Sequence, residues 1–140
     1  MSPVKRVMCY LLALFMTVAG IMHFIKPAMY AALIPPFLPA PMFLVYASGV
    51  VEIVVGIGLL LPRYRRLAAW GIIATLIAVF PANIYHAAEG GLSHPDLPES
   101  FANPTGAYIR LPFQFLFIAW AWWFTRPASD SDARPATSDE

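Results

Sequence analysis

The sequence has very little charge for its length. Charged residues make up 12% of the 140 residues, whereas a soluble domain has roughly 25%. No basic run is longer than Arg65–Arg66, and the formal net charge is +1. Charge this weak and dispersed argues against nucleic acid as a partner. Hydrophobic residues make up 59% of the chain, which indicates a protein whose solvent is lipid.

Cysteine is nearly absent as well. Cys9 is the only cysteine, so the chain by itself forms no disulfide, no C-x-x-C redox pair and no cysteine-based metal site. Thiol–quinone exchange within this chain is excluded for the same reason. We expect no metal site.

What the sequence does contain is four long apolar stretches, at residues 7–24, 42–61, 67–86 and 105–124. The first and third lack Asp, Glu, Lys and Arg, the second contains only Glu52, and the fourth contains only Arg110. About 20 apolar residues, at about 1.5 Å each, cross a hydrocarbon core of roughly 30 Å. The pattern therefore predicts an all-α membrane protein, a four-transmembrane-helix bundle that forms one domain over residues 1–126. The expected helices are at about 5–25, 42–61, 66–87 and 106–125.

The segments between these stretches differ in character. Residues 25–41 hold five prolines, which rule out a continuous helix. The segment is still apolar, so we expect it to lie at the membrane interface with a short helix near 28–33. Residues 87–104 contain Gly90-Gly91 and three prolines and predict a solvated loop. The tail, 127–140, is rich in Ser, Asp and Pro and is expected to be disordered in the cytoplasm.

Basic residues predict the orientation. With both termini cytoplasmic, seven basic residues lie on the inner side and only Lys26 and Arg110 on the outer side, as the positive-inside rule requires. The first apolar stretch is longer than the apolar core of a usual signal peptide and is expected to be retained. Small residues that share helix faces, such as Gly20, Gly56 and Gly71, predict close helix packing.

Glu52 and Arg110 are the two charges expected at membrane depth. A carboxylate at mid-bilayer costs several kcal/mol unless it is protonated or paired. Arg110 lies at the start of its helix, where the dipole disfavours a cation. Each is the other's only charged candidate within the membrane, so we predict a Glu52–Arg110 ion pair, with Gln114 on the same face as Arg110. A pair that only locks the bundle remains an equal alternative.

Other polar residues are expected at outer depth and complete a candidate ligand pocket made of His23, Glu52, Asn83, His86, Arg110 and Gln114. For the two histidines we expect a hydrogen bond to loop backbone or, second, to a ligand head group. Asn83 is expected to bond the Ile77 carbonyl, freed by Pro81, or a ligand. Haem-binding bundles usually carry more histidines, which argues against haem.

Four motifs carry a family resemblance. They are Gly20-Ile21-Met22-His23-Phe24, Ser48-Gly49-Val50-Val51-Glu52, Pro81-Ala82-Asn83 and Arg110-Leu111-Pro112-Phe113-Gln114. Together they resemble the DoxX-like small bacterial membrane proteins over about residues 5–125. The resemblance implies a multi-pass four-helix bundle in the bacterial inner membrane. It also implies a link, for some members, to quinone-dependent respiratory systems, and it supplies no catalytic residues.

Three functions follow from these features. The first is a quinone-interacting or accessory subunit of a membrane oxidoreductase, with the electrons supplied by a partner subunit. In it His23, Arg110 and Gln114 donate to the quinone, Glu52 exchanges protons, and Tyr46, Phe113 and Phe117 pack the ring. The second is a non-catalytic scaffold or assembly partner whose polar cluster only locks the bundle. The third, a small transporter, is disfavoured by the apolar inner half and would require a homo-oligomer.

Overall fold

The computed structural model describes residues 2–91, 94–95, 97, 99 and 102–126. This part of the chain is all-helical. Its five helices are α1 (Pro3–Ile25), α2 (Pro27–Leu33), α3 (Pro41–Leu60), α4 (Arg65–Ala88) and α5 (Pro104–Trp123). The four long helices begin and end within two residues of the positions expected from the apolar stretches. The tail predicted to be disordered, 127–140, lies outside the described residues.

Proline sets where most of these helices begin. Pro3, Pro27, Pro41 and Pro104 are each the first residue of a helix. Proline suits this position because its φ is already helical and the first turn has no use for its missing N–H. Two of these starts also have a side-chain cap, since Ser2 accepts from the Lys5 amide at 3.2 Å and Asn103 from the Gly106 amide at 2.7 Å. The sequence therefore fixes these boundaries locally.

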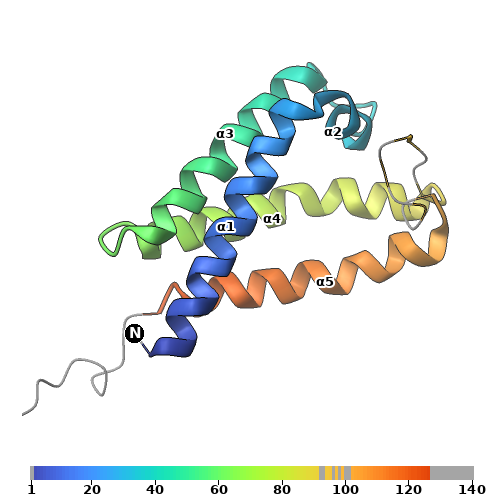
Figure 1. The fold of residues 1–140 in the computed structure, drawn as a ribbon. Helices are drawn as coiled ribbons and strands as arrows, with labels where there is room; N and C mark the ends of the chain where they lie inside the picture. The colour runs from blue at the N-terminus through green and yellow to red at the C-terminus, as the bar shows by residue number, and fades with distance from the viewer. Residues whose placement is uncertain (1, 92–93, 96, 98, 100–101, 127–140) are drawn as a thin grey trace, which may run out of the picture.

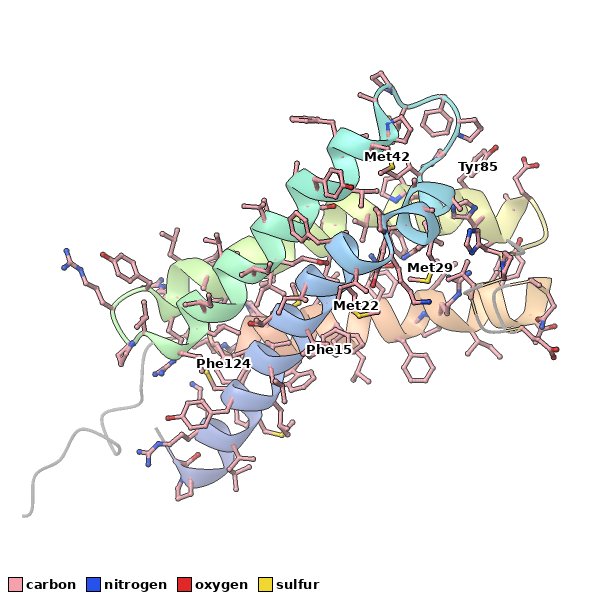
Figure 2. The ribbon with its side chains drawn as sticks, turned by 45° about the horizontal axis from the view of Figure 1, so that its top comes forward. Phe15, Met22, Met29, Met42, Tyr85 and Phe124 are labelled. Atoms are coloured by element: carbon pink, nitrogen blue, oxygen red, sulfur yellow. The ribbon has the colours of Figure 1, made fainter. Side chains whose placement is uncertain are left out.

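The long helices form two antiparallel pairs. Figure 1 shows α1 beside α3, and α4 beside α5, with the first pair crossing the second obliquely. The short helix α2, the end of α4 and the start of α5 lie at one end of the molecule, which we call the α2 end. The α3–α4 turn and the two ends of the described chain lie at the other, the turn end. Figure 2 shows Phe124, after α5, beside the first half of α1.

Glycine brings α1 and α3 into backbone contact. A Cβ added at Gly20 would lie 2.6 Å from the Gly49 carbonyl oxygen, and one added at Gly56 would lie 2.5 Å from Thr17 Oγ1. Both gaps are too small for a methyl group. Cys9, also on α1, donates its thiol to the Leu59 carbonyl of α3 at 3.4 Å. The small residues predicted on α1 and α3 thus lie where these two helices touch, whereas Gly71 of α4 packs against Val55.

The outer surface of the helices is apolar. Large hydrophobic side chains are exposed on every long helix, among them Leu14, Val54, Leu67 and Leu116, which are 62%, 61%, 72% and 63% exposed. Among the described helices α1, α3 and α4 are long and apolar enough to cross a membrane. A helix apolar on its outward face needs lipid or protein around it. The fold is therefore consistent with a membrane protein.

Candidate functional site

A cleft of about 260 Å³ opens between α1, α4 and α5 and extends toward the α2 end; we call it the polar cleft. Its polar lining is made by Asn83, Arg110 and Gln114. Its apolar lining is Leu12, Phe15, Met16, Ile72, Leu76, Val79, Phe113 and Phe117. Three of the six residues predicted to form a pocket therefore meet in one cleft.

Asn83 and Gln114 fasten α4 to α5 inside this cleft. Asn83 Nδ2 donates to Gln114 Oε1 at 2.5 Å, and Gln114 Nε2 donates to the Leu76 carbonyl of α4 at 2.6 Å. Gln114 is 5% exposed, and these two bonds use its oxygen and one of the two hydrogens on its amide nitrogen. The bond from Asn83 to Gln114 of α5 was not among the roles predicted for Asn83. The predicted bond to the Ile77 carbonyl stays a prediction.

Arg110 and Gln114 are separated by one helical turn on α5, and both line the polar cleft, as their spacing predicts. Phe113 and Phe117, also one turn apart, line the cleft beside them. Phe15 reaches Phe117 from α1, with ring centroids 4.9 Å apart and nearly parallel planes. The cleft thus combines a guanidinium, two amides and a stack of aromatic rings.

Glu52 lies against His23. Its Oε2 is 3.1 Å from His23 Nδ1, and the two side chains are 17% and 10% exposed. The same nitrogen is 2.7 Å from the Ala19 carbonyl oxygen. A carbonyl only accepts, so Nδ1 carries a hydrogen and donates it to Ala19. Gly20 and Gly49, one turn before each partner, let the two helices come close enough for this contact.

The structure thus places the Glu52 carboxyl group in contact with a histidine, and Arg110 lines the polar cleft. Glu52 and His23 are absent from the lining of that cleft among the described residues. The sequence could not reveal this division, because it depends on which pairs of helices adjoin. Contact between Glu52 and Arg110 stays a prediction.

His86 ties α4 to α2. Its Nε2 is 2.6 Å from the Leu33 carbonyl oxygen, and the residue is 4% exposed. This backbone bond is the first of the two roles expected for the histidines. His23 likewise has one ring nitrogen on a backbone carbonyl, but that carbonyl, Ala19, lies in its own helix and not in a loop as expected. In the described part of the chain no three His, Cys, Asp or Glu side chains are grouped to hold a metal ion.

Tyr30 is a site residue that the sequence analysis missed. Its ring stacks on His23 with centroids 3.9 Å apart. Burial, and second the nearby Glu52 carboxyl group, raise the pKa of Tyr30 above its ordinary value. The available signal was weak: a tyrosine in an apolar segment, seven residues after His23 and across the break at Lys26. Tyr46, expected to pack a ligand, instead stacks on Phe24.

Chemically, the polar cleft offers charged and amide donors at one end and aromatic faces along its sides. This set suits a flat, partly polar ring. The His23–Glu52–Tyr30 group is a separate polar cluster between α1, α2 and α3.

Comparison with curated proteins gives no match, and neither does comparison with solved structures. A family model does match, over residues 12–125. That range includes every residue of the polar cleft and of the His23–Glu52–Tyr30 cluster. The chain therefore belongs to the family described as a domain of unknown function, DUF8561.

Proposed function

We propose that the protein crosses the bacterial inner membrane four times, with both termini in the cytoplasm. α5 supplies the fourth crossing: its 20 residues extend about 30 Å, and it runs beside α4 over its length (Figure 1). Arg110 lies in the polar cleft, between helices, where a membrane arginine is tolerated.

Cationic and aromatic side chains at the turn end support this orientation. Arg126 lies over the Trp122 ring, 4.0 Å from its centroid, and Lys5 lies 5.8 Å from the centroid of Trp123. Tryptophan and basic residues gather at the cytoplasmic interface of membrane proteins. The motif resemblance leads us to propose further that DUF8561 is related to the DoxX-like proteins.

We propose that the polar cleft binds the ring of an isoprenoid quinone, as an accessory subunit of a membrane oxidoreductase. One observation carries this: Arg110, Asn83 and Gln114 converge from two helices on a cleft otherwise walled by apolar and aromatic groups. Binding sites for small ligands measure about 300–1,000 Å³. At about 260 Å³ the cleft holds a ring head group, and the tail leaves between the helices into lipid. Electrons come from a partner subunit.

The test is the quinone content of the purified full chain, extracted and identified by mass spectrometry. We expect close to one quinone per chain. Loss of a charge-assisted hydrogen bond costs about 1.5–3 kcal/mol, so Arg110→Gln should lower the content about ten-fold or more. Phe117→Ala should lower it as well. Leu116→Ala is the matched control, because Leu116 neighbours Phe117 but is 63% exposed on the outward face.

Quinone-free protein, or equal content in all four proteins, would refute quinone binding. Glu52→Gln separates the two groups of residues. Since Glu52 is not part of the described cleft lining, this variant should change thermal stability and leave quinone content per folded chain unaltered.

One observation favours a scaffold as the second candidate. The polar groups of Asn83, Gln114 and His86 are bonded to protein groups on neighbouring helices. Such bonds hold a bundle together without any ligand. On this alternative, Asn83 and Gln114 variants reduce stability and partner assembly, and the purified protein carries no quinone.

A further inference from the structure

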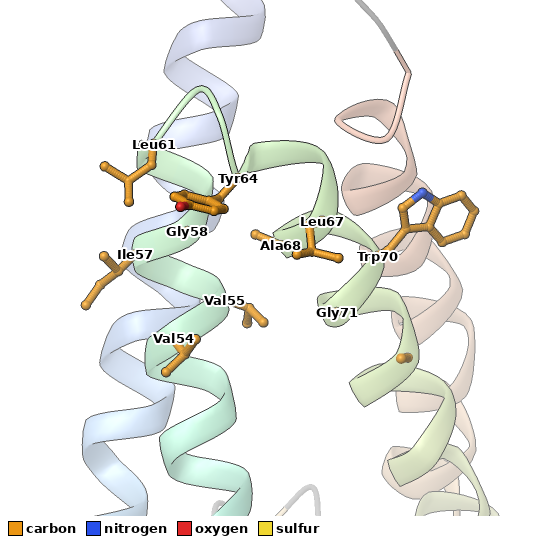
Figure 3. A pocket seen from close by; sticks show the side chains of 11 residues that line it. Val54, Val55, Ile57, Gly58, Leu61, Tyr64, Leu67, Ala68, Trp70 and Gly71 are labelled. Atoms are coloured by element: carbon orange, nitrogen blue, oxygen red, sulfur yellow. The ribbon is translucent and has the colours of Figure 1, made fainter.

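A second cleft lies at the opposite end of the molecule from α2. It is an apolar groove of about 710 Å³ between α3 and α4, beside the turn that joins them. Figure 3 shows Val55 and Ala68 pointing into the gap between the helices, beneath the turn that carries Tyr64. We call it the turn groove.

Close helix contacts form the floor of the turn groove. A Cβ added at Gly58 would lie 2.9 Å from the Ala68 Cβ, and one added at Gly71 would lie 2.8 Å from Val55 Cγ1. The two helices therefore touch at the floor, and the larger side chains Ile57, Leu61 and Trp70, which are 48%, 47% and 48% exposed, form the rims.

The turn groove has the length of an acyl chain segment. On α3 its lining runs from Val54 to Leu61, and on α4 from Leu67 to Ala74. Each span is seven residue steps, about 10 Å. One leaflet of the hydrocarbon core is about 15 Å thick. The groove thus follows one chain over about two thirds of a leaflet.

Positive charge stands at the mouth of this groove. Arg63 and Arg66 lie in and just after the α3–α4 turn, and both are exposed. The Arg63 guanidinium lies 5.5 Å from the centroid of the Tyr64 ring, which itself lines the groove. A phosphate at this level would meet two guanidinium groups while its acyl chain lay in the groove.

We propose that the turn groove is a specific site for an anionic phospholipid, with one acyl chain between α3 and α4 and the phosphate on Arg63 and Arg66. Charge complementarity selects this occupant over a second copy of the chain. In a twofold dimer that buries this face within one membrane, both copies have Arg63 and Arg66 at the same membrane level, so four guanidinium groups would gather around one interface. The proposal is independent of quinone binding and holds for either leaflet.

The experiment is native mass spectrometry of the full chain in detergent, titrated with dioleoyl phosphatidylglycerol or dioleoyl phosphatidylcholine. The two lipids have the same acyl chains and differ in net charge. We expect one phosphatidylglycerol to be retained per chain more tightly than phosphatidylcholine. Each arginine near a membrane surface contributes about five-fold in affinity. The double variant Arg63→Gln with Arg66→Gln should therefore lose about 25-fold in affinity for phosphatidylglycerol, whereas Arg63→Lys with Arg66→Lys should retain most of it.

The groove itself is tested by filling it. Ala74 is exposed and lines the turn groove, and Ala78, one turn further along α4, is exposed and outside its described lining. Ala74→Trp should weaken retention of both lipids, and Ala78→Trp should not. Equal retention of the two lipids by the parent protein, or unchanged retention in the glutamine variant or in Ala74→Trp, would overturn the proposal. A dimer that Ala74→Trp dissociates would also overturn it, by assigning the groove to a second copy.

Discussion

Gly20→Ala tests the packing on which the α1–α3 pair depends. The added methyl carbon would lie 2.6 Å from the Gly49 carbonyl oxygen and 2.9 Å from the Ile53 amide nitrogen. Both are backbone atoms of α3, so no side-chain rotation relieves the clash and the helices must separate. Extra carbon in a packed interior costs about 1–3 kcal/mol. Alanine stabilises a helix by about 0.5–1 kcal/mol relative to glycine, so we expect the free energy of unfolding to fall by about 1–2 kcal/mol.

The assay is thermal unfolding of the full chain in detergent, followed by circular dichroism. For a chain of this size about 1 kcal/mol corresponds to about 3–5 °C in Tm, so Tm should fall by about 3–10 °C. Ala119→Leu is the control, because Ala119 is exposed on α5 and leucine is nearly as good a helix former. A Tm equal to or above that of the parent protein would refute backbone contact between α1 and α3.

Three further predictions concern the polar groups. Gln114→Leu leaves the Leu76 carbonyl and the Asn83 amide without their observed partner and should cost about 1–3 kcal/mol of stability. In thermal unfolding, the double variant Asn83→Leu with Gln114→Leu should lose less stability than the two single variants lose together. Strictly additive losses would contradict the Asn83–Gln114 hydrogen bond. His86→Phe removes the bond to Leu33, so hydrogen exchange of the α2 amides should accelerate by up to about ten-fold. Tyr85→Phe should not accelerate it, and unchanged exchange in His86→Phe would count against the tie. Because burial raises the Tyr30 pKa, its neutral form persists in the folded state to a higher pH than in the unfolded chain. The stabilisation that neutral Tyr30 gives the folded state should therefore be present below pH 10 and disappear as the pH rises through the pKa of Tyr30 in the folded protein. In an ultraviolet titration, the parent protein should show one tyrosine that ionises late, and Tyr30→Phe should lack it. Identical titration curves for the two proteins would argue against burial of Tyr30.

Sequence alone determined the helices and their boundaries. Helix length follows from the apolar stretches, and proline marks the first residue of α1, α2, α3 and α5. These are local effects, because proline fixes φ and an apolar run of this length suits lipid whatever its neighbours are. The one-turn spacing of Arg110 and Gln114 likewise placed both on one face of α5.

Which polar groups meet was decided by tertiary structure. Glu52 contacts His23 because glycines bring α1 and α3 together, while Arg110 lines a cleft between α1, α4 and α5. Depth along each helix can be counted from the sequence, but depth does not say which helices adjoin or how each is rotated about its axis. The stacking of Tyr30 on His23 depends in addition on how α2 folds back after the break at Lys26. Pairwise contacts across helices are set by packing, and packing is a property of the whole bundle.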